Sequence, residues 1–280
     1  ADNIAEDETD AFKQIRQFLE FFPQNIYEIP ERKLSEDPIN REQEELLSIV
    51  PKDRKKSYEM RDIIKYVFDE ASFFEMTKFF GRGIITGFAR INGYSVGILA
   101  NDSNFYAGSM SADGAKKTAR FVRTCDTFNI PIVSLVDEPG FLIGPEAESQ
   151  ATILYGTEAV LAVTESTVPW STVMIRKSFG VAAAAHYGPD GYVLAWPSAE
   201  SGPLPLEGGV AVAFKKEIES AKDPEAKRKE IEQKMSKNQN PFPRAESFSV
   251  HEIIDPRKTR FYLSNWAERI QTQMKAKLFK

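Results

Sequence analysis

Cysteine and histidine are nearly missing from this sequence, and their scarcity removes whole classes of site. The 280 residues include one cysteine, Cys125, and two histidines, His186 and His251. A single cysteine excludes a disulfide framework and a zinc cluster built on thiolates, and it suits a reducing compartment. We interpret Cys125, which lies inside a helical pattern, as core packing. Two histidines without clustered cysteines give only weak support for a metal site, which carboxylates would have to complete, so none is expected.

Long apolar runs and charge of one sign are missing too. No run approaches the roughly 20 apolar residues that a membrane span needs, so no membrane contact is expected. The net charge is −5 with both signs interspersed, which argues against nucleic acid as the main partner. The acidic segment ADNIAEDETD is unlike a signal or transit peptide. We therefore expect a cytoplasmic protein, or one of the mitochondrial matrix if the source is a eukaryote.

Common catalytic signatures are missing as well. The chain contains neither a G-x-S-x-G nucleophile motif nor a P-loop, and the GRG at 81–83 falls short of a dinucleotide fingerprint. Glu146 and Glu148 follow Pro145, so they fit the first turn of a helix better than an acid–base pair. The Met-Lys at 274–275 lacks the surroundings of a biotin-attachment module. An enzyme with this sequence needs a device other than catalytic side chains.

What is present divides into two parts, residues 1–56 and residues 57–280. Residues 8–22 predict an amphipathic helix that ends at Pro23. Its expected apolar face consists of Ala11, Ile15, Phe18, Leu19 and Phe22. Residues 23–56 are polar, contain prolines and show no periodicity, which is typical of an extended arm that crosses another surface. We expect this arm to need a partner surface.

Residues 57–280 predict one compact domain in which helices alternate with buried strands. Asn92-Gly93 between two apolar runs is a strong hairpin signal. The expected strands cover 83–91, 94–100, 130–137, 167–175 and 192–196, and the expected helices cover 58–70, 112–128, 149–164, 209–220 and the Ala-rich run after Gly180. Asp223-Pro224 should break the charged segment 214–237. Such alternation implies an α/β fold with a largely parallel sheet.

The C-terminal segment predicts a last helix with one apolar face. The residues expected on that face are Phe261, Leu263, Trp266, Ile270 and Met274. Their spacing follows the period of an α-helix, so the face should pack on this domain or on a partner chain.

The most informative stretch is RKSFGVAAAAHYG at 176–188. An apolar, β-rich run stops there at a Phe-Gly turn and continues as the Ala-rich helix. This order places the N–H groups of Gly180, Val181 and Ala182 at a helix N-terminus, where they lack intrahelical partners. The helix dipole adds partial positive charge, so the turn is suited to an anion. We predict a charge-stabilising device made of these backbone amides.

Three loops beyond strand ends are candidates for the surroundings of a ligand. They cover 137–148, 177–182 and 197–208, and their glycines and prolines allow close backbone approach. Ligands of parallel sheets gather beyond the carboxyl ends of the strands, and the less favoured alternative for each loop is a tight connection. His186 follows the Ala-rich run, so it either takes part directly or is a partly buried helix residue.

Several motifs in combination resemble a known family. They are VRTCDTFNIPIVSLVDEPGFLIGPEAE, VPWSTVMIRKSFG, AWPSAE, NPFP and EIIDPRKTR. The chain resembles the C-terminal half of the carboxyltransferase (beta) subunits of biotin-dependent acyl-CoA carboxylases, and the propionyl-CoA carboxylase type most closely. The similarity runs from about residue 8 to about residue 265. It implies a crotonase-like fold, a superhelix of ββα units, with a single C-type domain behind the N-terminal helix and arm.

The resemblance also implies an activity and partners. Such a subunit moves the carboxyl group from carboxybiotin, held on a separate carrier protein and loaded by a biotin carboxylase, to the α-carbon of an acyl-CoA. Its active site lies where a C-type domain meets an N-type domain of another subunit. We therefore expect an N-type partner and an oligomer. In this family positioning and backbone oxyanion holes do most of the catalytic work.

The position of each residue in the motifs assigns the site. The resemblance implies an oxyanion hole at the N–H groups of Val181 and Ala182, with Gly180 beside them. The residues expected to bind biotin are Gly140, Phe141, Leu142 and Phe179.

Three positions depart from the family pattern. Val181 stands where glycine is usual, Leu204-Pro205 replaces a Met-Gly, and Ser111 replaces an acidic residue. Two other functions therefore stay open. One is a non-catalytic structural or regulatory paralogue in a carboxylase-like complex, and the other is a biotin-independent acyl-CoA decarboxylase.

Overall fold

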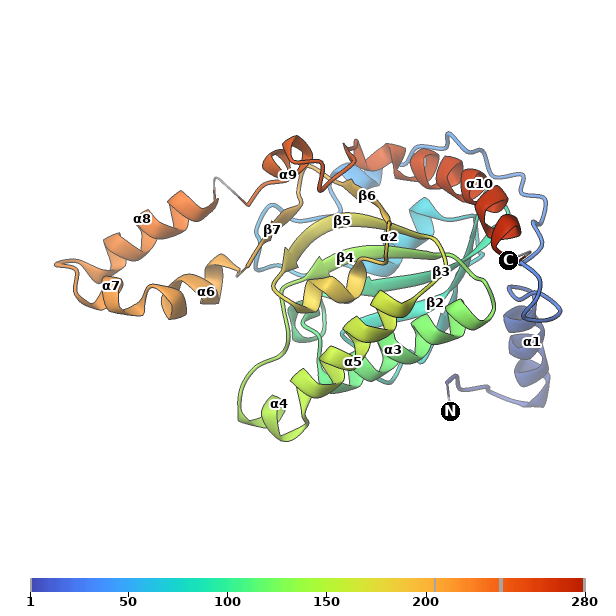
Figure 1. Ribbon diagram of the computed structural model, residues 1–280, viewed down its shortest axis with the longest axis horizontal. Helices are drawn as coiled ribbons and strands as arrows, with labels where there is room; N and C mark the ends of the chain where they lie inside the picture. The colour runs from blue at the N-terminus through green and yellow to red at the C-terminus, as the bar shows by residue number, and fades with distance from the viewer. Residues whose placement is uncertain (1, 204, 237–238, 279–280) are drawn as a thin grey trace.

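One mixed β-sheet with helices on both faces forms the centre of the molecule (Figure 1). The computed structural model describes residues 2–203, 205–236 and 239–278. The sheet has the order β1-β2-β3-β4-β5-β6-β8, and β7 pairs with β5 outside this path. The strands are β1 (Phe74–Met76), β2 (Ile84–Ile91), β3 (Tyr94–Asn101), β4 (Ile132–Glu138), β5 (Trp170–Phe179), β6 (Tyr192–Ala195), β7 (Glu200–Gly202) and β8 (Glu252–Ile253).

The helices follow the expected alternation with two differences. The α-helices are α1 (Glu8–Leu19), α2 (Met60–Val67), α3 (Ala112–Thr127), α4 (Pro145–Ser149), α5 (Thr152–Glu165), α6 (Leu206–Ala213), α7 (Lys215–Glu219), α8 (Pro224–Ser236), α9 (Phe242–Glu246) and α10 (Thr259–Leu278). The short 3₁₀ turns are η1 (Glu44–Leu47), η2 (Tyr106–Gly108), η3 (Ala182–His186) and η4 (Pro256–Lys258). The predicted helix 209–220 is divided at Phe214 into α6 and α7, and the predicted Ala-rich helix is only the 3₁₀ turn η3.

The register of the sheet confirms the hairpin and the parallel arrangement. β2 and β3 are antiparallel with Ile91 opposite Tyr94, and Asn92 and Gly93 form the turn with φ of 51° and 78°. Positive φ at both positions is what a two-residue hairpin turn of this kind requires, so Asn-Gly suits it. From β3 onward, β4, β5, β6 and β8 all pair in parallel.

Two apolar layers cover the sheet, one on each face. Helices α3 and α5 lie against one face together with Phe88, Leu99 and Cys125, so Cys125 is core packing as predicted. Helices α2 and α10 cover the other face with Ile85 and Ile98. Because both faces are covered, the central strands are buried along nearly their whole length.

The last helix buries most of its predicted face. Leu263, Trp266, Ile270 and Met274 of α10 are buried against the sheet layer. Phe261 is 43% exposed, so its inclusion in that face was wrong. Its side chain instead lies beside Tyr262, with ring centroids 5.7 Å apart.

The first helix is only half attached to the domain. Phe18 of α1 and Phe22 just beyond it pack on Phe88, with ring centroids 5.8 Å and 5.0 Å away. Ile15 and Leu19 are 53% and 59% exposed, although the periodicity grouped them with the buried aromatics. The apolar stripe of α1 is therefore wider than the surface of the domain that it contacts.

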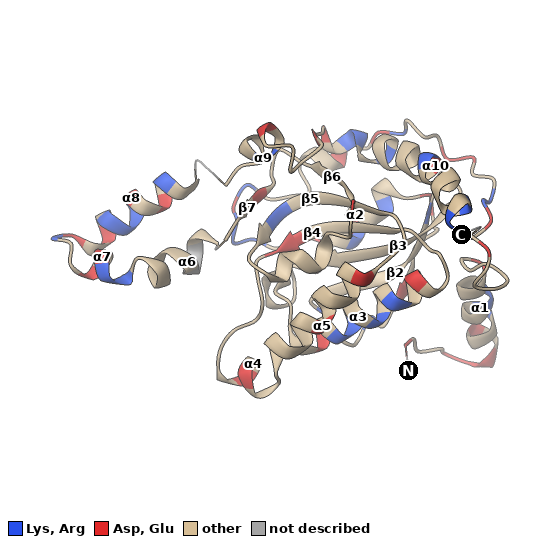
Figure 2. Ribbon diagram, viewed as in Figure 1, with Lys and Arg blue, Asp and Glu red and all other residues tan. Residues whose placement is uncertain are grey.

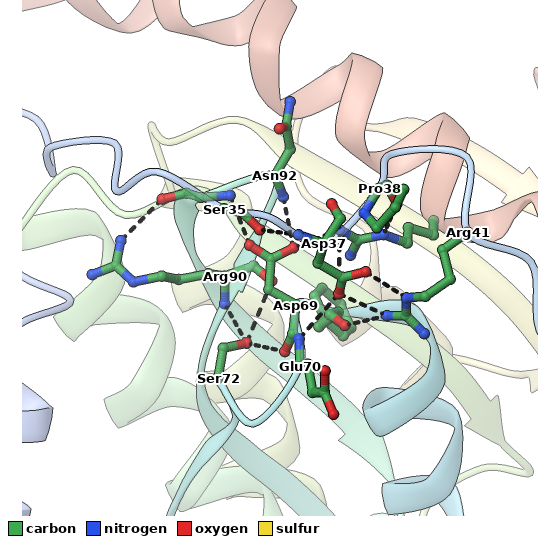
Figure 3. Close-up of polar contacts among 12 residues, drawn as sticks. Ser35, Asp37, Pro38, Arg41, Asp69, Glu70, Ser72, Arg90 and Asn92 are labelled. Carbon is green, nitrogen blue, oxygen red and sulfur yellow. Dashed lines mark hydrogen bonds and ion pairs between the residues drawn. The ribbon is translucent and has the colours of Figure 1, made fainter.

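The arm lies across this chain's own domain, where charged side chains attach it. Arg41 holds Asp37 at 2.6 Å and 3.0 Å and donates to the carbonyl oxygens of Tyr66 and Phe68 at 3.0 Å and 2.9 Å (Figure 3). The N–H of Glu70 donates to the Asp37 carboxylate at 3.1 Å. These contacts satisfy carbonyls at the end of α2, so this stretch of the arm packs on its own domain, and a partner surface for the arm stays a prediction.

A second buried cation joins the arm to the hairpin and to α10. Arg260, 1% exposed, donates to Pro38 O at 2.8 Å and to Asp69 Oδ1 at 2.8 Å. The Asp69 carboxylate accepts in turn from the N–H groups of Asn92 and Gly93 at 3.0 Å and 2.7 Å (Figure 3). One carboxylate therefore caps the hairpin turn and neutralises Arg260. The boundary that we predicted at 56/57 stays a prediction.

The segment from α6 to α8 projects from the body as a helical hairpin (Figure 1). It has a small core of its own, in which Leu206 and Val210 meet Ile231. Lys, Arg, Asp and Glu alternate along α7 and α8 (Figure 2), and α8 begins at Pro224 as predicted. The mixed charge matches a solvated surface.

Candidate active site

The three candidate loops meet at one edge of the sheet. Glu138 at the end of β4 is in register with Ser178 near the end of β5, and Phe179 is in register with Gly202 of β7. All three strands are parallel neighbours, so the segments that follow them leave the sheet at the same edge. The sequence predicted this meeting correctly.

The turn after β5 is tighter than expected. Gly180 has φ +65°, and its N–H donates to Gly202 O at 3.1 Å, which extends the pairing with β7. The N–H of Gly180 is therefore not available to an anion, which corrects its place among the predicted amides. Val181 follows with φ −72° and ψ −30° and starts the five-residue turn η3.

The two remaining amides of the predicted device differ in exposure, and the N–H of Ala182, which has no exposed surface, does not reach a ligand on the surface. Among the described residues, no backbone acceptor is hydrogen-bonded to the N–H of Val181 or of Ala182. The Val181 side chain is 70% exposed, whereas Ala182 is fully buried. The β-branched side chain thus points into solvent at the very turn where the family usually has glycine.

The loop after β4 is held in an extended, open conformation. Gly140 has φ +129°, and a Cβ built at this position meets nothing within 4 Å. Its N–H donates to Glu138 Oε1 at 2.9 Å, and its carbonyl accepts from Met110 N at 3.1 Å. Leu142 N donates to Met110 O at 2.9 Å. Hydrogen bonds to Glu138 and Met110 therefore hold loop 139–144 on its inner side, while its outer side at Gly140 stays open.

The two predicted aromatic contacts differ in exposure. Phe141 is half-buried, and its ring lies over Gly156 of α5, where a Cβ would come within 2.3 Å of Phe141 Cε1. Phe179 is fully buried at the end of β5. Its side chain cannot touch a ligand on the surface, so the expectation of direct contact with biotin is wrong for Phe179.

An ion pair lies directly beneath the loops. Asp137 is fully buried and accepts from Arg176 Nη2 at 2.8 Å and from Lys177 N at 3.0 Å. Arg176 also donates to Lys56 O at 2.8 Å and lies over the ring of Tyr58, 4.8 Å from its centroid. The ends of β4 and β5 are thus joined by side chains as well as by their backbone ladder.

A second buried group, which the sequence analysis missed, involves Glu138 and His186. Both are fully buried, and Glu138 Oε2 lies 3.5 Å from His186 Nε2 and accepts from Asn101 Nδ2 at 3.0 Å. Ser134 Oγ lies 2.9 Å from His186 Nδ1. Burial raises the pKa of the Glu138 carboxyl, while His186 and the Gly140 amide lower it. The signal available in the sequence was the pair of consecutive acidic residues that ends an apolar run.

His186 therefore has neither of the two roles that we left open. Its ring is inside the molecule and cannot reach a surface ligand, and it ends a 3₁₀ turn instead of lying part-buried in a helix. His251, in contrast, is exposed and accepts from Val193 N at 3.0 Å beside β6. Among the described residues, no group of three His, Cys, Asp or Glu side chains is arranged to hold a metal ion.

The remaining sequence-predicted positions have structural explanations. Glu146 and Glu148 are exposed in the first turn of α4 after Pro145, as expected. Ser111 caps α3 by accepting from Gly114 N at 3.1 Å. Leu204 lies outside the described residues, and Pro205 precedes α6 as its N-cap.

Two hollows differ in their distance from this edge. A small one of about 250 Å³ lies beside Gly180 and is lined by Ser178, Tyr187 and Arg244 among others. A larger one of about 450 Å³ lies at the other end of β5, against Trp170 and α10. The small hollow adjoins the turn after β5, because Gly180, Ala183 and Ala184 also line it. No helix in the described parts of the chain is long and apolar enough to cross a bilayer.

Comparison with known proteins identifies relatives of the whole chain. The family model described as the carboxyl transferase domain matches residues 1–280. The propionyl-CoA carboxylase carboxyltransferase subunit of Haloferax mediterranei is 40% identical over 258 residues, which cover 90% of this chain and 50% of that protein. The methylmalonyl-CoA decarboxylase subunit alpha of Propionigenium modestum is 37% identical over 92% of this chain and 50% of that protein.

A solved structure agrees with the fold. The transcarboxylase 12S hexamer with methylmalonyl-coenzyme A bound superposes with a TM-score of 0.89 at 37% identity, over 97% of this chain and 53% of that chain. The resemblance and the crotonase-like fold class predicted from the sequence are thereby confirmed. The chain spans about half the length of the relatives that it matches.

Proposed function

Since this chain belongs to the carboxyl transferase domain family, we propose that it is the carboxyltransferase component of a biotin-dependent acyl-CoA carboxylase. In this role it moves the carboxyl group from carboxybiotin to the α-carbon of an acyl-CoA. The observation that carries the proposal is the turn at Val181, an exposed residue whose N–H has no backbone acceptor among the described residues. This turn leaves the sheet at the edge where parallel α/β proteins bind ligands.

The residues around this turn fit a biotin ring. Gly140 offers open space, Phe141 offers a half-buried aromatic face, and Leu142 is half-buried next to it. Biotin supplies, when bound, a ureido group that carries the carboxyl and takes up negative charge when the carboxyl departs. The N–H of the exposed Val181 is a donor suited to that charge, because a fixed backbone dipole needs no reorganisation during the reaction.

The other half of the site is assigned to partners. We propose that an N-type carboxyltransferase domain supplies most of the acyl-CoA site, and that a biotin carrier protein and a biotin carboxylase deliver carboxybiotin. Asp137 and Glu138 at the end of β4 are both fully buried, so they do not act as an acid–base pair on a ligand at the loop edge. A monodisperse monomer with full acyl-CoA carboxylation activity would contradict this division. Native mass spectrometry of the purified complex measures it.

A proline at position 181 tests the proposal directly. Val181 has φ −72°, which proline adopts without strain, so Val181→Pro removes one N–H and leaves the turn geometry in place. Loss of one oxyanion donor typically lowers kcat by about 100- to 1000-fold. Val181→Ala keeps the N–H and is the matched control, expected to retain most activity. Equal transfer rates for the two variants, in the complex with its N-type partner, would sink the proposal.

The second candidate is an acyl-CoA decarboxylase. A decarboxylase subunit is 37% identical to this chain, close to the 40% of the propionyl-CoA carboxylase subunit, so identity alone does not separate the two. Release of CO2 from a carboxylated acyl-CoA, measured with and without a biotinylated carrier, separates them. Release without the carrier favours the biotin-independent decarboxylase, and no reaction in either direction favours the non-catalytic paralogue.

A further inference from the structure

Glu138 and His186 are buried at the centre of the polar contacts beneath the loop edge. Neither side chain has any exposed surface, and Glu138 Oε2 lies 3.5 Å from His186 Nε2. Both come from segments that end in the candidate site, because Glu138 is the last residue of β4 and His186 is the last residue of η3. The pair therefore joins the end of β4 to the end of η3 below the surface.

Each member of the pair is fixed to one segment. Glu138 Oε1 accepts from the N–H of Gly140 at 2.9 Å, which sets the course of loop 139–144. The carbonyl of His186 accepts from Thr172 Oγ1 at 2.8 Å, and its Nδ1 lies 2.9 Å from Ser134 Oγ. His186 thus anchors the end of the five-residue turn whose start carries the amides of Val181 and Ala182.

The ring of His186 has one unused polar atom, and it faces the carboxylate. Among the described residues, Nε2 has no hydrogen-bond partner although it is buried. When Ser134 donates to Nδ1, the proton of the neutral ring sits on Nε2, so the ring can donate to Glu138 after a small approach. Leaving the buried Nε2 donor of His186 unpaired costs free energy. This cost favours arrangements in which Nε2 donates to the Glu138 carboxylate.

Stability alone does not account for such a pair. Buried charged and polar groups are generally neutral or unfavourable for stability compared with apolar residues of the same volume. They do fix one arrangement of the elements that carry them, because every other arrangement leaves a buried polar group unsatisfied. Here the elements are the two sides of the candidate ligand site.

We infer that Glu138 and His186 are positioning residues that hold loop 139–144 and the turn 180–186 in one relative position. The contact couples the open side of Gly140 to the turn that carries the exposed Val181, on a different segment. The inference deepens the proposed function, on which it rests for the identity of the site. It concerns this chain's own backbone, so it has a readout that needs no catalysis.

Amide hydrogen exchange in the full complex provides that readout. Glu138→Leu should raise exchange in 139–144 and also in 180–186, and His186→Leu should raise it in the same two segments. Each single substitution should raise the exchange rate in the two segments by about three- to tenfold. Because the two residues interact, the exchange rate of the double variant should exceed that of the faster single variant by less than about twofold. Exchange that rises only in the segment carrying the substitution, or effects that multiply in the double variant, would overturn the inference.

Conservative variants separate positioning from simple loss of folding. Glu138→Gln keeps an acceptor for Gly140 N, and His186→Gln keeps a donor for Glu138. The exchange rates of segments 139–144 and 180–186 in both variants should therefore stay within about twofold of those in the wild type. Asp69→Asn is the matched control. Asp69 is also buried and also joins two elements, because its Oδ1 accepts from Arg260 Nη2 of α10 at 2.8 Å, but neither residue belongs to the candidate site. The control variant should destabilise the protein without selective exchange at 139–144 and 180–186. Selective exchange there in the control, or none in either leucine variant, counts against the inference.

Transfer kinetics in the same complex complete the test. Misplaced loops should raise the KM for the biotin carrier and lower kcat together in both leucine variants, with recovery in the glutamine variants. A wild-type complex that transfers no carboxyl group but shows coupled exchange contradicts only the proposed function. An active wild type whose two segments exchange independently contradicts only the positioning role.

Discussion

Asp137 and Arg176 form an ion pair between neighbouring strand ends, with Arg176 Nη2 2.8 Å from Asp137 Oδ2 and side-chain exposures of 0% for Asp137 and 5% for Arg176. The same carboxylate accepts from Lys177 N at 3.0 Å, so it binds the backbone of β5 as well as the Arg176 side chain. It lies directly before Glu138 and three residues before Gly140. The ion pair therefore links the course of the loop after β4 to the turn after β5.

Removing one partner of this pair should be strongly destabilising. Asp137→Asn leaves the Arg176 charge buried without its counter-ion, and breaking a buried pair in this way typically costs about 3–5 kcal/mol. Urea unfolding measures the loss. Arg123→Gln, which breaks the exposed pair with Glu158 at 2.8 Å, is the control and should cost less than about 1 kcal/mol. Equal losses in the two variants contradict the structural role of the buried pair.

Val181→Gly tests whether the isopropyl group obstructs the site. The side chain is 70% exposed, so in an active enzyme it points away from biotin and its removal should change turnover little. A slight fall is allowed, because glycine costs up to about 1 kcal/mol in helical conformations. In a degenerate paralogue the same change should raise biotin affinity or create measurable transfer. The sign of the change in transfer rate decides between the two functions.

Gly156→Ala should displace the ring of Phe141. A Cβ at position 156 would lie 2.3 Å from Phe141 Cε1, which is closer than carbon atoms approach. Alanine favours a helix by up to about 1 kcal/mol over glycine, yet we expect no gain in melting temperature because the ring must move. Biotin affinity, followed by titration, should fall. The double variant Gly156→Ala/Phe141→Leu should regain stability without regaining affinity; full affinity in the single variant contradicts a role for Phe141.

The unfolding free energy of the protein should depend on pH because Glu138 titrates. Burial raises the pKa of this carboxyl in the folded protein, so the folded state keeps a proton that the unfolded chain releases near about pH 4.3. The stabilising contribution is present in full below that pH and is lost as the pH rises through the folded pKa. Glu138→Gln cannot titrate. The unfolding free energy of the wild type minus that of Glu138→Gln should therefore fall as the pH rises above about 4.3, and a rise refutes the assignment.

Local patterns in the sequence determined the order and kind of most elements. Asn92-Gly93 specifies a hairpin because its turn needs positive φ at two adjacent residues, and Pro224 starts a helix because proline lacks the N–H that an interior position needs. The alternation of buried strands and helices predicted the parallel sheet, and parallel pairing alone brings the three loops to one edge. Each of these signals acts over a few residues, so each can be read without the fold.

Tertiary structure decided which groups at that edge are free. The N–H of Gly180 is used by Gly202, which reaches it through a strand pairing that no local pattern encodes. Phe179 and His186 face the interior because of their places on β5 and η3, although Gly180, next to Phe179, is exposed. The arm lies on its own domain because Arg41 and Arg260 find acceptors far away along the chain. Periodicity gives the face of an element, but the availability of a hydrogen-bonding group depends on what the rest of the chain brings beside it.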